Sequence, residues 1–189
     1  MNTQKDFIVI GVTGEPSSGK DTFAQIIEEK GFHHISGGDF LREEAKKIGV
    51  PLDRTSITNF VMKMRKEKGL QYPMDIVIEN VFNNTVISGM RNTTEVDLLK
   101  NTFGNKFYMV AVTATPEIRY ERMKKRGRIG DEVTFEIFKK EESVEKRGGS
   151  GTHELSKVIE NADYKIDNSG SGEEFKKKVD EWFRGIIKR

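Results

Sequence analysis

The chain contains no cysteine among its 189 residues, so it can form neither a disulfide nor a thiolate metal site. Histidine is nearly as scarce: His33 and His34 are adjacent, His153 is far away, and no metal-ligand spacing results. Charge of one sign is also lacking, because 32 basic residues face 30 acidic ones and the net charge is only +2. The whole molecule therefore has no strong field, which argues against general binding of nucleic acid or membrane surfaces.

Long apolar runs are missing as well. No segment approaches the length of a membrane-spanning helix, and residues 1–6 have none of the features of a signal peptide. We therefore expect a cytoplasmic protein. Its length favours a single domain, residues 1–189, that is large enough to bury a real core. The core pattern is complete without a partner surface, so we expect a monomer.

The most informative motif is Gly-Glu-Pro-Ser-Ser-Gly-Lys at residues 14–20, which fits the phosphate-binding pattern G-x-x-x-x-G-K. The apolar run 7–12 before it predicts a strand buried on both faces, and apolar residues at helical spacing in 21–30 predict an amphipathic helix after it. In that context, loop N–H groups and the positive helix end favour a triphosphate, and the lysine adds a full charge. The predicted ATP-binding residues are Gly14, Glu15, Pro16, Ser17, Ser18, Gly19, Lys20, Asp21 and Thr22.

The rest of the chain alternates between strand and helix patterns. Further strands are predicted at 32–36, 85–88, 107–112 and 162–167. Further helices are predicted at 41–48, 56–68, 73–82, 93–103, 116–126, 134–146 and 172–188. Asn92 and Glu95 form a plausible capping pair before one of them. This alternation predicts an α/β P-loop NTPase fold, with a five-stranded parallel sheet covered by helices on both faces.

Two further motifs carry a family resemblance. Ser36-Gly37-Gly38-Asp39-Phe40-Leu41-Arg42 follows the second predicted strand, and Ser88-Gly89-Met90-Arg91 ends the third. With the phosphate loop, they resemble the nucleoside monophosphate kinases, adenylate kinase above all. Residues 162–168 are similar to the dephospho-CoA kinases and the phage-type deoxynucleotide kinases, and the latter also have Asp after the loop lysine. The resemblance covers about residues 8–179 and implies a P-loop nucleotide kinase.

The resemblance also implies roles for individual residues. The segment 35–84 would bind the acceptor, and 127–151 would form a small lid that closes to exclude water. Arg122 would lie near the base and phosphates of ATP, and Arg126 would clamp the phosphoryl group in transfer. The implied acceptor site consists of Ser36, Gly37, Asp39, Arg42, Gly89 and Arg91, and the implied catalytic residues are Lys20, Arg91, Arg122 and Arg126.

These arginines have a simpler alternative. Arg119, Arg122 and Arg126 fall at i, i+3 and i+7 on one helical face, and such a charge stripe is usually just solvated. Arg42 sits among other charged residues and could be a surface residue too. Arg91 follows the carboxyl end of a strand, where ligands bind in such sheets, which favours function.

The implied activity is transfer of the γ-phosphoryl of ATP to a small phosphate-bearing acceptor, and a nucleoside or deoxynucleoside monophosphate is favoured. A dephospho-CoA kinase-like enzyme and a non-metabolic, nucleotide-binding regulatory ATPase remain alternatives. Mg²⁺ would accompany ATP. Asp21 stands where a Ser or Thr is usual, and Ser88 where an Asp is usual, so we hypothesise that these two metal ligands are exchanged. The alternative is that Asp21 only caps its helix.

Overall fold

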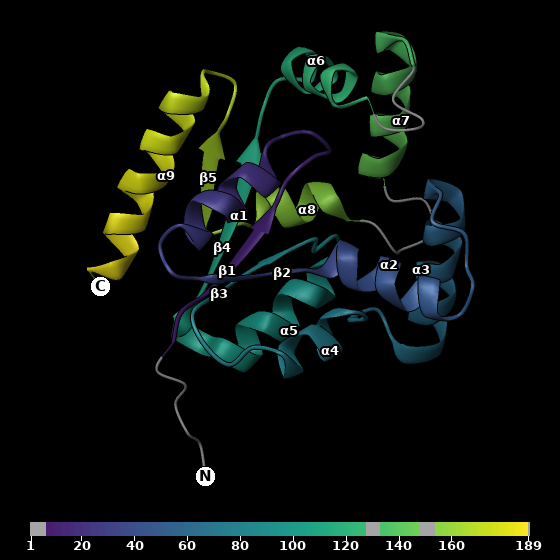
Figure 1. The fold of residues 1–189 in the computed structure, drawn as a ribbon, viewed down its shortest axis with the longest axis horizontal. Helices are drawn as coiled ribbons and strands as arrows, with labels where there is room; N and C mark the ends of the chain where they lie inside the picture. The colour runs from purple at the N-terminus through teal and green to yellow at the C-terminus, as the bar shows by residue number, and fades with distance from the viewer. Residues whose placement is uncertain (1–6, 128–132, 148–153, 189) are drawn as a thin grey trace.

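A parallel sheet between two layers of helices organises the computed structural model, which describes residues 7–127, 133–147 and 154–188 (Figure 1). The strands lie in the order β2-β3-β1-β4-β5, and all neighbouring pairs are parallel. This confirms the predicted fold class. After β1, the chain forms β2 and β3 on one side of it and then crosses to form β4 and β5 on the other side. Ligands bind in such sheets where the direction of winding reverses, which here is the carboxyl end of β1. The strands are β1 (Val9–Thr13), β2 (His33–Ser36), β3 (Thr85–Ser88), β4 (Phe107–Thr113) and β5 (Tyr164–Asp167).

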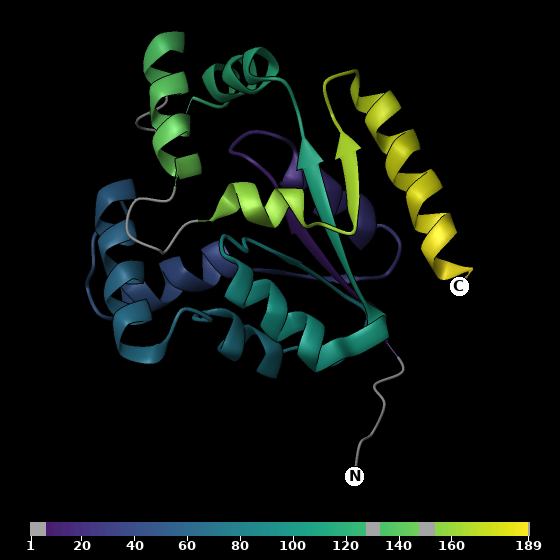
Figure 2. The same cartoon turned by 180° about the vertical axis from the view of Figure 1, so that it is seen from behind.

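Helices cover both faces of this sheet (Figures 1 and 2). One face packs against α1 (Lys20–Glu28) and α9 (Gly172–Ile187). The other packs against α4 (Met74–Glu79), α5 (Thr93–Phe103) and α8 (Leu155–Glu160). The remaining elements are α2 (Gly37–Lys47) and α3 (Arg54–Lys68) beside the sheet, α6 (Pro116–Arg126) and α7 (Phe135–Arg147) beyond its carboxyl end, and the short η1 (Gly104–Lys106).

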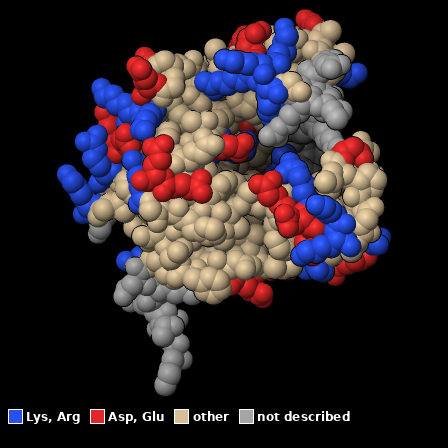
Figure 3. Space-filling view, in the orientation of Figure 1, with Lys and Arg blue, Asp and Glu red and all other residues tan. Residues whose placement is uncertain are grey.

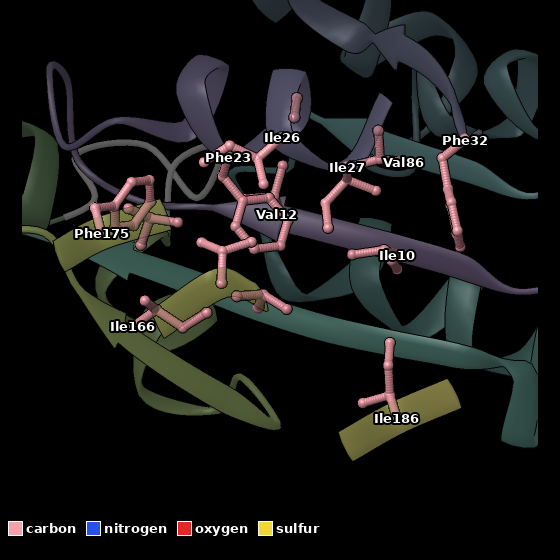
Figure 4. Close-up of a cluster of buried hydrophobic side chains, with 14 residues drawn as sticks. Ile10, Val12, Phe23, Ile26, Ile27, Phe32, Val86, Ile166, Phe175 and Ile186 are labelled. Atoms are coloured by element: carbon pink, nitrogen blue, oxygen red, sulfur yellow. The ribbon is translucent and has the colours of Figure 1, made fainter. Parts of the chain in front are cut away.

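The central strand β1 explains why both layers form. Ile10 and Val12 are fully buried against α1 and α9 (Figure 4), while Val9 is fully buried in the cluster on the other face. Burying such aliphatic side chains contributes roughly 1.5–3 kcal/mol each. A third small core, formed by Ala45, Phe60 and Val61, holds α2 against α3. In the part of the chain that the structure describes, no helix is long and apolar enough to cross a membrane.

Several predicted bounds differ from the structure by up to three residues, and two differences are larger. Helix α2 begins at Gly37 rather than at residue 41, because Ser36 Oγ accepts a hydrogen bond from the Asp39 N–H and caps the helix directly after β2. Helix α8 was not predicted at all, since only Leu155 and Val158 within it are buried and so short a pattern gives little periodic signal. The predictions for β3, α5 and α6 are confirmed residue for residue.

Candidate active site

The loop between β1 and α1 adopts backbone conformations that favour glycine. Gly14 has φ 151° and Gly19 has φ 107°. A Cβ atom on Gly14 would lie 2.1 Å from the Val112 carbonyl oxygen, and one on Gly19 would lie 2.1 Å from Nδ2 of Asn168. Among the described residues no side chain caps α1, which begins at Lys20, so its first N–H groups can serve a ligand.

Two hydroxyls in this loop lack partners. Ser17 Oγ and Ser18 Oγ are buried and make no hydrogen bond to any residue that the structure describes. Ser17 is also held at a φ of 61°, which is unusual for a residue other than glycine. Buried hydroxyls without partners are costly, so they indicate a ligand that accepts hydrogen bonds. A phosphate group fits this requirement. Glu15, Pro16 and Thr22 lie in the same loop and first helical turn.

Lys20 lies at the centre of a group of cations. Its Nζ donates a 2.9 Å hydrogen bond to the Glu15 carbonyl oxygen. Burial, followed by the charges of Arg91 and Arg126, lowers the pKa of Lys20 from 10.5 to about 8, although Asp21 and Glu15 partly oppose the shift. Arg91 follows β3 and Arg126 ends α6. Two arginines from other elements therefore act on Lys20 beside the phosphate loop.

Asn168 is a site residue for which the sequence predicted no role. It follows β5 and is 5 % exposed. Its Nδ2 donates a 2.8 Å hydrogen bond to the Ser18 carbonyl oxygen, and its Oδ1 accepts from Arg122 Nη2 at 3.3 Å. Arg122 Nη1 also lies 3.5 Å from the Ser18 carbonyl oxygen. The prediction that Arg122 lies at the donor side is therefore consistent with its place beside the phosphate loop.

The predicted acceptor residues gather where β2 and β3 end. Gly89 has φ 103°, and a Cβ atom there would lie 3.2 Å from the Gly38 nitrogen, so the end of β3 approaches the first turn of α2 closely. Gly37 and Asp39 belong to this turn, which Ser36 caps. Arg42 Nη1 donates to Asp39 Oδ1 at 2.7 Å, and both side chains are exposed. Asp39 therefore orients Arg42 at a place that a ligand can reach from solvent.

The main chain of Arg91 is held on both sides. Its N–H donates to Glu95 Oε2 at 2.7 Å, and its carbonyl oxygen accepts from the Glu154 N–H at 2.9 Å. The preceding carbonyl, that of Met90, accepts from Thr13 Oγ1 at the end of β1 at 3.1 Å. These contacts tie the loop that carries Arg91 to the strand that carries the phosphate loop. The predicted capping box of Asn92 and Glu95 is confirmed.

The three arginines of α6 do not share one environment, contrary to the predicted stripe. Arg119 is 1 % exposed, forms an ion pair with Glu142 of α7, and lies 5.7 Å from the centre of the Phe138 ring. Arg122 faces the phosphate loop, and Arg126 is exposed at the helix end. Arg119 therefore joins α6 to α7 and contributes to structure rather than to phosphate binding.

The predicted lid, 127–151, is partly helical and partly outside the described residues. Residues 128–132 and 148–151 lie outside them, whereas Gly127 ends α6 with φ 60°. Within this segment, helix α7 buries apolar side chains against α6. Phe138 is 4 % exposed, Phe135 lies 5.2 Å from the Tyr120 ring, and the Tyr120 hydroxyl donates to the Val133 carbonyl. Helix α7 therefore packs firmly on α6.

The two hypothesised metal ligands have different surroundings. Asp21 is exposed in the first turn of α1. Ser88 is 5 % exposed, and its Oγ lies 2.9 Å from Nε2 of His34. The hydroxyl of Ser88 thus already has a protein partner, which weakens its case as a ligand. Within the described ranges, no cluster of three or more His, Asp or Glu residues forms a metal site by itself.

A hollow opens beside the phosphate loop, between α2 on one side and α6 and α7 on the other (Figure 3). Basic and acidic side chains gather on its rim. Two pockets lie away from the phosphate loop: one of about 340 Å³ between the end of α2 and α3, and one of about 460 Å³ between β2, α2 and α4. The second includes Ser36 and Asp39, but neither contains a residue of the phosphate loop, so chemistry rather than pocket size identifies this site.

Comparison with known proteins shows which family and which fold the chain has. Residues 10–146 match a family described as an AAA domain. A UPF0200 protein of Thermococcus gammatolerans is 34 % identical over 188 residues, which cover 96 % of each chain. The chain belongs to the UPF0200 family. Among solved structures, the chain is similar to a shikimate kinase from Bacteroides thetaiotaomicron, with a TM-score of 0.57 and 15 % identity. The match covers 95 % of this chain and 98 % of the kinase. It is also similar to a gluconokinase from Sinorhizobium meliloti, with a TM-score of 0.53 and 15 % identity, over 98 % of this chain and 94 % of the gluconokinase. The chain therefore shares the fold of these P-loop kinases.

Proposed function

We propose that this UPF0200 protein transfers the γ-phosphoryl group of ATP to a small phosphate-bearing acceptor, namely a nucleoside or deoxynucleoside monophosphate. The observation that carries the proposal is that Lys20 is buried beside the phosphate loop within reach of the charges of Arg91 and Arg126; burial first, and then these charges, lower the pKa of Lys20 to about 8. Cations that repel one another beside a glycine-rich loop are stabilised when a polyanion binds among them. Perturbed groups of this kind are typical of functional sites.

The donor side is built to hold phosphates. The loop N–H groups, the hydroxyls of Ser17 and Ser18 and the ammonium of Lys20 would bind the β- and γ-phosphates. On binding, the phosphates would replace the Glu15 carbonyl as the partner of Lys20. Mg²⁺, when it arrives with ATP, would neutralise phosphate charge, and the exposed carboxylate of Asp21 is the oxygen donor in the first turn that would hold it.

The acceptor side offers two guanidinium groups and a helix end. Arg42 and Arg91 would bind the acceptor phosphate, since guanidinium groups bind phosphate in a bidentate manner. Gly37 and Gly38 open α2, so its positive end adds to this attraction. Asp39 holds Arg42 before the acceptor arrives. A dianionic phosphate suits this charge better than a neutral group does.

In the reaction, an oxygen of the acceptor phosphate forms a bond to the γ-phosphorus while the bond from that phosphorus to the β–γ bridging oxygen breaks, and ADP leaves. Such a transfer depends on positioning and on charge neutralisation more than on covalent help from the protein. Arg126 at the end of α6 would neutralise the group in transfer. Arg122 would hold the donor from the same helix.

A hydroxyl acceptor, as in a dephospho-CoA kinase-like enzyme, is the second candidate. It would need a base for the hydroxyl proton, and Asp39 is the carboxylate on the first turn of α2. Its contact with Arg42 favours the phosphate acceptor instead, because that contact already orients a phosphate-binding side chain. Asp39→Asn discriminates the two: a hydroxyl acceptor predicts loss of nearly all turnover, whereas a phosphate acceptor predicts a moderate rise in KM.

The experiment is a direct assay. The protein is incubated with Mg-ATP and each ribo- and deoxyribonucleoside monophosphate or dephospho-CoA, and nucleotide products are separated by ion-exchange chromatography. Lys20→Ala should keep its circular dichroism spectrum and lose turnover. Arg42→Ala and Arg91→Ala should weaken binding of the acceptor about tenfold to a hundredfold, since each removes a charge-assisted contact. Both substitutions should change the affinity for ATP far less. ATP hydrolysis that no small acceptor alters would instead favour a regulatory ATPase.

A further inference from the structure

Asn168 connects three elements around the phosphate loop. Its N–H donates to the Thr113 carbonyl oxygen at the end of β4, at 2.7 Å. Its Nδ2 donates to the Ser18 carbonyl oxygen in the loop, and its Oδ1 accepts from Arg122 on α6. The main chain fixes the residue at the sheet, while its amide uses a donor and an acceptor at the same time. Few side chains of this size can do both.

The contact with Ser18 also sets the direction of a neighbouring N–H group. The peptide between Ser18 and Gly19 is trans, since the cis peptide that the described residues contain lies elsewhere. In a planar trans peptide the C=O and the following N–H point in opposite directions. Because Asn168 holds the Ser18 carbonyl on its own side, the Gly19 N–H must face away from Asn168. That direction leads into the loop, where a phosphate would bind.

The Asn168 amide packs closely against Gly19 of the loop. A Cβ atom at Gly19 would lie 2.1 Å from Nδ2 of Asn168, so the amide rests directly on the loop. Asn168 is 5 % exposed, and water therefore has little access to take over its hydrogen bond. The loop thus keeps one peptide orientation before any ligand arrives, which lowers the cost of ordering it on binding.

We propose that Asn168 is a positioning residue for the polyphosphate of the donor: it directs the Gly19 N–H toward the phosphates and holds Arg122 beside them. The inference rests on the proposed function, because it assigns a role within the same donor site. It concerns the phosphates, because the side-chain amide of Asn168 contacts the phosphate loop directly and holds Arg122 beside that loop.

The test compares Asn168→Ala and Asn168→Asp with Asn84→Ala. Asn84 is a matched control, because its Oδ1 accepts a 2.9 Å hydrogen bond from the Ile8 N–H and so also joins distant segments, but at the amino end of the sheet. Calorimetry measures Kd for Mg-ATP and for Mg-tripolyphosphate, and thermal unfolding gives Tm. Steady-state kinetics give the KM of the acceptor found in the direct assay.

We expect Asn168→Ala to weaken the binding of both ligands by at least about fivefold, the value of one hydrogen bond, because it removes the contacts with the Ser18 carbonyl oxygen and with Arg122. Asn168→Asp should raise the Kd of both ligands by more than about tenfold, because a carboxylate repels the Ser18 carbonyl oxygen and the phosphates. The acceptor KM should stay within about twofold. Asn84→Ala should lower Tm and leave both Kd values within about twofold.

Three results would overturn the inference. Wild-type affinity in Asn168→Asp would show that the amide does not position the loop. A loss for Mg-ATP without a loss for Mg-tripolyphosphate would mean that Asn168 contacts the nucleoside. A rise in the acceptor KM and in both Kd values that follows the fall in Tm across all three variants would leave only a structural role. A wild-type protein that binds neither ligand would instead contradict the proposed function itself.

Discussion

Arg65 of α3 and Glu95 of α5 form an ion pair inside the protein, where their side chains are 3 % and 0 % exposed. Arg65 Nε also donates to the Tyr72 carbonyl oxygen at 3.0 Å. The second carboxylate oxygen of Glu95 accepts from the N–H groups of Arg91 and Asn92. One buried carboxylate thus connects the helical segment of the predicted acceptor site to the loop that carries Arg91.

Breaking this pair should be strongly destabilising. Glu95→Gln leaves the Arg65 guanidinium buried without a full counter-charge, and we expect a loss of about 3–5 kcal/mol in the free energy of unfolding. Urea denaturation measures it. Glu44→Gln is the control, because its pair with Lys47 lies at the surface and should contribute little to stability. Equal effects of the two substitutions would argue against a structural role for the buried pair.

The low pKa of Lys20 predicts that ATP binding depends on pH. In the protein without ligand, the Lys20 side chain is mostly protonated below pH 8 and mostly neutral above it. Bound phosphates favour the charged form, so binding takes up a proton above pH 8, and the affinity should fall by up to about tenfold per pH unit. Calorimetry in buffers of different ionisation enthalpy detects that proton. Lys20→Arg stays charged, so its affinity should lose this slope even if binding is weaker throughout.

The same shift has a consequence for the ligand-free protein. Lys20 has a pKa of about 8 when folded and 10.5 as its ordinary value, so between these values the unfolded chain binds more protons than the folded one. The contribution of Lys20 to stability therefore rises as the pH increases from 8 to 10.5. Unfolding curves of Lys20→Met should lack this rise relative to the wild type. A parallel pH dependence in both proteins would contradict the lowered pKa.

Local signals in the sequence were enough to predict the frame of the molecule. The phosphate loop lies between a buried strand and an amphipathic helix, and each of these patterns is complete within about ten residues. The same is true of α5, whose capping box of Asn92 and Glu95 spans four residues and is found in the structure. Where a few neighbouring residues determine the geometry, the sequence predicts it.

The parts that were missed depend on partners far along the chain. Asn168 meets Ser18 across 150 positions, and Arg65 meets Glu95 across 30. Nothing near either residue indicates the contact. Arg119 illustrates the opposite error: its spacing fits a solvated stripe, but Glu142 of another helix buries it. Long-range pairing of polar groups decides these roles, and helical periodicity cannot predict such pairing.

Asp21 should affect how the protein uses magnesium. If its carboxylate holds Mg²⁺, directly or through water, Asp21→Ser should shift the Mg²⁺ concentration that half-saturates ATP binding and turnover. If Asp21 only favours the N-terminus of α1, the substitution should lower Tm slightly and leave that concentration unchanged. Thr22→Ala, at the neighbouring exposed position, is the comparison. Binding measured by calorimetry over a range of Mg²⁺ distinguishes the two cases independently of activity.

Arg126 should matter for the rate far more than for ATP binding. It ends α6 beside Gly127 and is exposed, yet close enough to Lys20 to affect its pKa. An arginine that neutralises charge in the transition state can contribute roughly 10³–10⁵ in rate. Arg126→Ala should therefore reduce kcat at least about a hundredfold with a modest change in the Kd of ATP, because the contact is stronger in the transition state than in the ground state.

Lys125→Ala is the matched control for Arg126, since it removes a neighbouring exposed cation from the same helix. Its kcat should stay within about threefold of the wild type, the range expected for a surface charge that acts only through screened Coulomb forces. If 127–151 closes as a lid, amide hydrogen exchange in that segment should slow when ATP and acceptor are both bound. The packing of Phe138 against α6 means that the change should be largest outside the core of α7. Equal exchange with and without ligands, together with normal turnover in Arg126→Ala, would identify the segment as a fixed surface element rather than a lid.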